Sequence, residues 1–229
     1  MFFFDPVYLL FISPAILFGL WAQAKVSGAY GKYSKVANLQ RITGFEAAKR
    51  LLFVNKLDHV SVERTQGRLS DHYEPRAKAL RLSDGVYNSD SVAALGIVAH
   101  EVGHAVQHQV GYSWMRVRTA LVPVYSVGSY LGWILLLAGL ILQVYGLAWI
   151  GFFVFLLATL FVVATLPVEL NASNRARAML STNGMVTAAD AQGVSAVLSA
   201  AALTYVAALM QAVMQLMYFA FPLLGSRRD

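Results

Sequence analysis

Residues 119–168 read TALVPVYSVGSYLGWILLLAGLILQVYGLAWIGFFVFLLATLFVVATLPV, and this stretch decides the fold. The chain carries no charged residue between Arg118 and Glu169. A hydrocarbon core about 30 Å thick takes roughly 20 residues of helix, so the stretch is too long for one membrane span and fits two. We predict a helical hairpin with spans at about 121–142 and 147–167. Gly128 and Gly132, on one helix face, would let a neighbouring helix approach closely.

Two further apolar segments extend this hairpin to a bundle of about four transmembrane helices. Residues 7–24 are long enough for one span, and residues 197–221 for another. The first segment ends in "AQA", which resembles a signal-peptidase cleavage site, but no Lys or Arg precedes it. We therefore predict a retained anchor. In the last segment, Gln211 and Gln215 lie one turn apart, and we expect this polar face to turn into the bundle.

The composition agrees with a membrane protein and limits the chemistry of any site. Of the residues, 58% are hydrophobic and only 13% are charged. The chain has no cysteine, so a metal site must use His, Asp or Glu. The net charge of +6 is not gathered into a basic stripe with interleaved aromatic residues, so we do not expect nucleic-acid binding.

The cations that flank the predicted spans indicate how the chain is oriented. Most of them fall on one side of the bilayer, which the positive-inside rule assigns to the cytoplasm. Arg227 and Arg228 disagree, since four spans would leave them on the opposite side. The cations on the predicted cytoplasmic side are Lys25, Lys32, Lys35, Arg116, Arg118, Arg175 and Arg177.

The region 25–118 has the mixed pattern of a small folded α+β domain. Thr43 and Glu46 in "TGFEAAKRLL" form a capping-box pattern that begins a helix of roughly a dozen residues. The segments "HVSVE" (59–63) and "AKALRLS" (77–83) alternate in hydrophobicity, and we predict a small antiparallel sheet from them. The segment "NSDSVAALGIVAHEVGHAVQHQVGY" predicts a helix over residues 91–110.

Within this last helix, His100, Glu101 and His104 form the pattern HExxH. Histidines four residues apart stand on one helix face, so both imidazoles can bind one divalent ion, for which Zn²⁺ is suited. Glu101 projects about 100° round from His100, where its carboxylate can take a proton from metal-bound water. The alternative is a coincidence of polar residues on a solvated helix face.

Catalytic zinc normally has three protein ligands, so a third ligand has to be found. Val110 stands where an extended HExxH motif has its third histidine, which rules that motif out. His108 lies two turns from His100, too far to share one coordination shell with it. We interpret His108 as a residue that supports the ligands from outside that shell or lies at an interface. His59 and His72 remain possible ligands.

The best candidate is Glu169. Two crossings return the chain to the side it left, so Glu169 and the HExxH helix should lie on the same side of the membrane. A carboxylate at the hydrocarbon boundary is costly unless it is paired or bound to metal. The structural alternative is an ion pair with Arg175 or Arg177.

Three blocks of the chain resemble a known family. The blocks "LSDHYEPRAKALRLSDGVY" (69–87), "SVAALGIVAHEVGHAVQH" (91–108) and "LPVELNASNRA" (166–176) resemble, in order, those of the YugP-like neutral zinc metallopeptidases of bacteria. The chain is more distantly similar to the Ste24 and HtpX membrane proteases. In that group a glutamate of an E-x-x-x-D block is the third zinc ligand, which the resemblance carries onto Glu169. Here Ser173 stands in place of the aspartate that would orient a ligand histidine.

The resemblance also implies that an extended peptide pairs with an edge strand beside the active-site helix, and "DHYEPR" is where we expect that edge. Candidates for a donor to the oxyanion of the tetrahedral intermediate are His72, Tyr73 and Arg175. Each has a structural alternative, namely packing or contact with lipid headgroups.

The sequence thus predicts a mostly α protein, a multi-span membrane helical bundle with a small cytoplasmic α+β zincin-like domain that carries the HExxH helix. We expect a zinc-dependent endopeptidase in the bacterial plasma membrane that binds one Zn²⁺ and cleaves peptides or membrane proteins at the cytoplasmic face. The alternatives are an intramembrane-cleaving metalloprotease and a non-catalytic membrane scaffold. The predicted divisions are an anchor (1–24), the metallopeptidase region (25–118), the hairpin (119–168), a third-ligand segment (169–196), the fourth span (197–221) and a tail (222–229).

Overall fold

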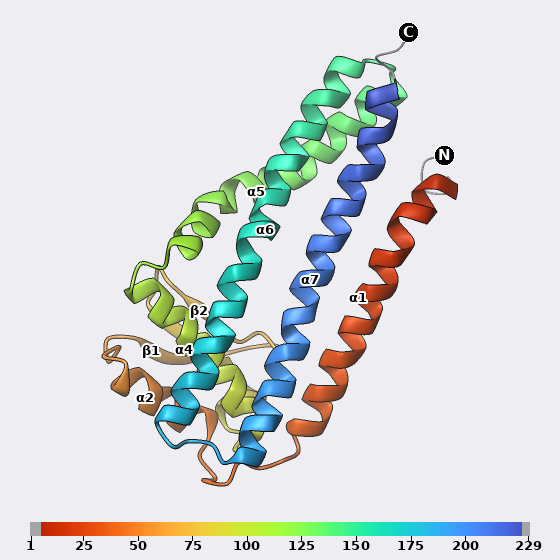
Figure 1. Cartoon of the computed structure of the whole chain (residues 1–229). Coiled ribbons are helices and arrows are strands. Elements are labelled where there is room, and N and C mark those ends of the chain that lie inside the picture. The colour runs from red at the N-terminus through yellow and green to blue at the C-terminus, as the bar shows by residue number, and fades with distance from the viewer. Residues whose placement is uncertain (1–5, 226–229) are drawn as a thin grey trace. The chain divides into compact units, whose positions relative to one another are not determined.

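The computed structural model describes residues 6–225, which are mostly helical with one small sheet (Figure 1). Arg227 and Arg228, whose charges disagree with the predicted orientation, lie outside the described residues. In chain order, the elements are α1 (Pro6–Tyr33), α2 (Gly44–Val54), β1 (Ser61–Thr65), β2 (His72–Glu74), β3 (Ala79–Ser83), α3 (Asp84–Tyr87), α4 (Val92–Gln109), α5 (Ser113–Ile141), α6 (Tyr145–Thr182) and α7 (Ala188–Gly225).

Four helices among the described residues are long and apolar enough to cross a membrane, as the sequence predicted. They are α1, α5, α6 and α7, and each extends beyond the apolar segment that identified it. The largest extension is in α6, which continues through Pro167 to Thr182. Glu169 therefore lies on the same helix as the third predicted span. A proline removes one backbone hydrogen bond of a helix, but here it does not end the helix.

The described residues fall into two compact units, of which the first is built from the apolar helices. It comprises the described parts of Met1–Ala22, Ser113–Pro167 and Leu203–Asp229. A Cβ added at Gly132 of α5 would lie only 2.8 Å from the backbone nitrogen of Phe155 in α6. The predicted close approach at this glycine is confirmed.

A cavity of about 300 Å³ in this first unit is lined by residues of α5, α6 and α7. Gln211 and Gln215 both line it, the first exposed and the second half-buried. The polar face of the fourth span is thus turned into the bundle only in part.

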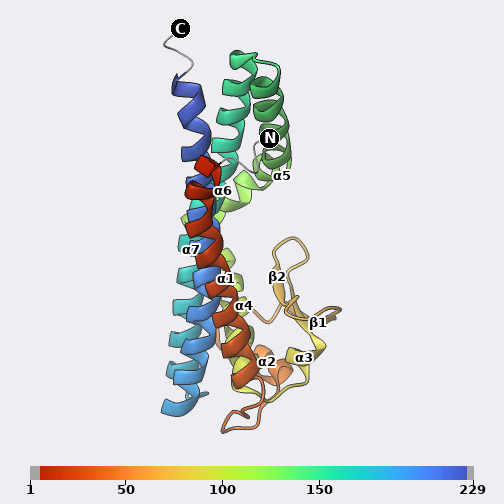
Figure 2. The same ribbon diagram turned by 90° about the vertical axis from the view of Figure 1, so that its right-hand side faces the viewer.

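The second unit comprises Gln23–Tyr112 and Val168–Ala202, and α4 lies at its centre. On one side α4 packs against the sheet, and on the other against the parts of α6 and α7 that belong to this unit (Figure 2). The core of the unit is formed by buried aliphatic side chains of α2, the sheet, α4, α6 and α7, among them Leu51, Leu80, Leu82, Leu95, Val98 and Leu180.

Two helices of this unit begin at N-terminal capping residues that can be recognised in the sequence. Thr43 accepts a hydrogen bond from the Glu46 amide, and the Glu46 carboxylate accepts one from the Thr43 amide. The capping box predicted at the start of α2 is therefore confirmed. Ser91 caps α4 by accepting a hydrogen bond from the amide of Ala94.

The sheet is mixed, so the prediction of an antiparallel sheet was wrong for one pair of strands. The strand order is β1-β3-β2, in which β1 runs parallel to β3 and β2 antiparallel to it. Alternation identifies a strand and its buried face, but it does not specify which neighbour the strand pairs with. The short strand β2, which lies between the two predicted strands in sequence, pairs with β3 and forms one edge of the sheet, while β1 forms the other. The edge at β2 lies in the segment "DHYEPR", as we expected.

Candidate metal centre

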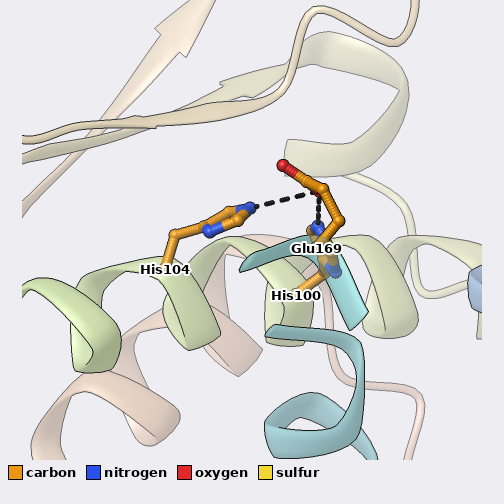
Figure 3. A group of neighbouring side chains, drawn as sticks. All are labelled: His100, His104 and Glu169. Atoms are coloured by element: carbon orange, nitrogen blue, oxygen red, sulfur yellow. Dashed lines mark hydrogen bonds and ion pairs between the residues drawn. The ribbon is translucent and has the colours of Figure 1, made fainter. Parts of the chain in front are cut away.

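Three side chains from two helices converge in the second unit. Helix α4 places His100 and His104 one turn apart, and α6 places the Glu169 carboxylate opposite both imidazoles (Figure 3). Glu169 Oε2 lies 3.2 Å from His100 Nε2 and 3.6 Å from His104 Nε2. Among the described residues, this is the one group of His, Asp and Glu side chains close enough to share an ion, with ligand atoms within 4.8 Å of one another.

The chemistry and spacing of these donors fit a zinc ion. Tetrahedral zinc with bonds of about 2.0–2.2 Å holds its donor atoms about 3.3–3.6 Å apart, close to the distances from Glu169 to the two imidazoles. Two nitrogens and one carboxylate oxygen are a donor set of catalytic zinc, which keeps a fourth position for water. Glu169 is only 2% exposed, and a carboxylate buried to that degree needs a compensating positive charge.

Each histidine of the cluster has a partner at Nδ1, the ring nitrogen that faces away from Glu169. Ser173 Oγ lies 3.1 Å from His100 Nδ1, and Gln107 Oε1 lies 3.0 Å from His104 Nδ1. When Nδ1–H donates to these oxygens, the Nε2 lone pair of each ring is left for the metal. Ser173 thus takes the place that the resemblance gives to an aspartate, and it orients His100.

Gln107 is a residue of this site that sequence reasoning missed. It is fully buried, and its Nε2 donates to Val168 O at 2.8 Å and to Asn171 Oδ1 at 3.0 Å. These two acceptors fix the orientation of the carboxamide, so that its oxygen faces His104. The available signal was a glutamine three residues after His104, and therefore on the same face of α4.

Glu101 lies beside the donor cluster, half-buried, and its Oε2 accepts a hydrogen bond from the Tyr73 amide at 3.0 Å. Burial raises the pKa of the Glu101 carboxyl, while the imidazoles of His104 and His100 act in the opposite direction. A carboxyl group with a raised pKa is better suited to exchange protons near neutral pH.

The three candidate oxyanion donors lie in different surroundings. His72 Nδ1 is 2.7 Å from Ser70 O, and His72 is not part of the donor cluster. The Tyr73 hydroxyl lies 2.9 Å from His108 Nδ1, so His108 contacts this residue of the sheet. Arg175 Nε donates to Asn171 Oδ1 at 2.8 Å and so adjoins the hydrogen bonds that orient Gln107.

Comparison with known proteins identifies the family. Residues 8–223 match the model of a family described as "Putative neutral zinc metallopeptidase". The chain belongs to this family. It is also similar to "Putative membrane protease YugP" of Bacillus subtilis (strain 168), with 39% identity over 223 residues that cover 97% of this chain and 99% of that protein. No solved structure gives a significant match.

The family assignment confirms the resemblance drawn from the three sequence blocks. All three blocks lie within the matched residues, and the zinc named in the family description agrees with the donor set on α4 and α6. The curated relative is named as a membrane protease, and the described part of this chain has four apolar helices long enough to cross a membrane.

Proposed function

We propose that this protein is a zinc-dependent integral-membrane endopeptidase that hydrolyses peptide bonds near the cytoplasmic membrane face. The observation that carries the proposal is the convergence of His100, His104 and Glu169, with Glu101 at its side. His100, His104 and Glu169 would hold one Zn²⁺, which supplies a Lewis acid and lowers the pKa of a bound water.

Each neighbouring residue then has a definite task. Glu101 takes the proton from the attacking water and delivers it to the leaving amine of the cleaved peptide bond. The Tyr73 amide holds the Glu101 carboxylate in place at 3.0 Å. Ser173 and Gln107 keep the Nε2 atoms of the two histidines turned toward Glu169.

An extended peptide would bind along the outer edge of β2. In the described part of the chain β2 has a neighbouring strand on one side only, and main-chain pairing on the other side is a general way to bind peptides. The Tyr73 amide already points from this strand toward Glu101. Unfolded peptides and segments of membrane proteins are therefore the substrates we propose. His72, Tyr73 and Arg175 remain the candidates for a donor to the oxyanion.

The function is tested by replacing Glu101 with Gln in the full-length protein. The variant should keep stoichiometric zinc and lose roughly 10²–10⁴-fold in kcat toward an unfolded casein-like substrate, because proton transfer is removed while the ligands stay. A chelator should abolish the wild-type activity. A zinc-loaded Glu101→Gln protein that cleaves at the normal rate would refute the proposal, and a wild-type protein that binds zinc without cleaving would favour a scaffold.

The cytoplasmic orientation needs a separate test, and the cysteine-free chain makes it simple. Gln109→Cys, at the exposed end of α4, should react with a membrane-impermeant thiol reagent only when the cytoplasmic face is accessible. Leu142→Cys, between α5 and α6, should react from the opposite face. If Gln109→Cys were inaccessible from both faces, the site would lie within the membrane, as an intramembrane protease requires.

A further inference from the structure

A second cavity lies in the unit that holds the metal centre, on the side of α4 that faces the sheet. Its volume is about 240 Å³, which suits one side chain rather than a large ligand. Buried side chains form the floor and exposed nitrogen-bearing side chains form the rim. The floor consists of Leu57, Tyr73 and Ala105, and the rim of His59, Lys78, His108 and Gln109.

The rim of this cavity offers positive charge and N–H donors, and none of the described residues that line it carries a carboxylate. Within residues 6–225, Lys78 makes no ion pair, so its ammonium is available to a ligand. The Tyr73 hydroxyl lies 2.9 Å from His108 Nδ1. If the hydroxyl donates, the proton of the His108 ring is on Nε2, which is a further donor. The carboxylate of Glu74, on the same strand as Tyr73, accepts the amide N–H of Arg76 at 3.1 Å.

Tyr73 connects this cavity to the catalytic base. Its backbone amide donates to Glu101, while its ring lies in the floor of the cavity and contacts His108. The cavity and the Glu101 carboxylate are therefore separated by about the length of the Tyr73 side chain. In an extended peptide successive residues are about 3.3 Å apart, so a peptide on the edge of β2 with its scissile bond at Glu101 would place a flanking residue over the cavity.

We propose that this cavity is a substrate subsite that binds a carboxylate next to the scissile bond. The carboxylate belongs to an acidic side chain or to the chain end of the peptide, and it is held by Lys78, His108 and His59. Hydrogen bonds between an ionised donor and a carboxylate are the strong ones, and the apolar floor accommodates the methylene groups below it. This inference rests on the proposed peptidase function, because it places the peptide by the position of Glu101.

The test uses three peptide series with the purified full-length protein in detergent. In the first series Glu is moved through the positions around the cleaved bond in a peptide with an amidated C-terminus. In the second, Gln replaces Glu at the same positions. In the third, the Gln peptides carry a free C-terminal carboxylate. We expect kcat/KM to be about tenfold higher for a carboxylate at one position than for its amide counterpart.

Charge-reversal variants locate the preference in the cavity. Lys78→Glu should remove or invert the preference for the carboxylate, measured within the variant as the ratio of kcat/KM between the Glu and Gln peptides. Lys49→Glu is the matched control, because Lys49 is an exposed lysine of α2 outside the cavity, and the preference should survive there. Retention of the full preference in Lys78→Glu would overturn the proposal.

Binding to the zinc-loaded Glu101→Gln protein separates this inference from the proposed function. Binding of the carboxylate peptides about tenfold more tightly than their amides, lost in Lys78→Glu, supports the subsite even if the wild type cleaves nothing. Cleavage without any carboxylate preference would overturn the subsite and leave the peptidase function standing. If the protein neither cleaved nor bound any of the peptides, the subsite and the peptidase function would both be overturned. A preference found only in the third series would assign the cavity to a chain end.

Discussion

Replacing Gly103 with Ala should loosen the metal centre at the point where α4 and α6 touch. An added Cβ would lie 2.8 Å from the carbonyl oxygen of Ala172 and 3.3 Å from its Cα, and both atoms belong to backbone. An ordinary contact begins at 3.4 Å, so the helices must separate by about 0.6 Å. Gly103 directly precedes His104, and Ala172 lies between Glu169 and Ser173. The distances from Glu169 to the imidazoles, 3.2 and 3.6 Å, would increase with that separation.

The expected magnitude combines two opposing effects on stability. Alanine in place of a helical glycine stabilises by about 1 kcal/mol, whereas overpacking costs about 1–3 kcal/mol, so the zinc-free protein should lose about 0–2 kcal/mol. The effect on the metal should be larger. Changes that disturb how ligands are held typically lower metal affinity by about 10–100-fold, and we expect a loss in this range.

Gly96 supplies a matched control on the same helix. A Cβ there would lie 3.4 Å from Val194 Cγ1, an ordinary contact with a side chain. Gly96→Ala should therefore leave zinc affinity unchanged and gain up to about 1 kcal/mol in stability. Zinc affinity is measured by competition with a chromophoric chelator, and stability by the Tm with and without zinc. If Gly103→Ala bound zinc as tightly as Gly96→Ala does, the contact between α4 and α6 would not set the geometry of the site.

Three further predictions concern single residues. Glu169→Ala should lose stoichiometric zinc during purification, and metal analysis that finds one retained zinc would move the third ligand elsewhere. Gln107→Leu should lower zinc affinity by about 10–100-fold, because His104 Nδ1 loses its acceptor; chelator competition measures this change. Thr43→Ala should remove the capping box of α2 and cost about 1 kcal/mol, seen as a lower Tm with unchanged zinc affinity.

Sequence reasoning located the features that depend on short-range patterns. The four apolar helices follow from hydropathy and length, and the capping box at Thr43 follows from two residues three apart. The pairing of His100 with His104 follows from the period of the helix. Glu169 could be proposed because a hairpin of two spans returns the chain to its starting side, and the structure brings its carboxylate to both imidazoles.

Features that depend on contacts between distant segments could not be predicted in the same way. Hydropathy shows where a lipid-facing segment ends but not where its helix ends, so the continuation of α6 to Thr182 was not foreseen. The parallel pairing of β1 with β3 depends on the short strand β2, which has too few residues for a clear alternation. The contact of Gln107 with Val168 and Asn171 joins residues more than sixty positions apart, and no local pattern marks it.

The hydrogen-bond partners of His100 and His104 have a consequence for inhibition under the proposed function. Ser173 and Gln107, which contact the two histidines, are both neutral. The negative charge at the cluster therefore comes from the carboxylates of Glu169 and Glu101. If one Zn²⁺ were held there with a neutral water, and Glu101 had taken its proton from the solvent, the single ligand carboxylate of Glu169 would leave one positive charge in excess at the site. Small anions with a zinc-binding group, such as hydroxamates or phosphonates attached to a short peptide, should therefore be attracted there as competitive blockers.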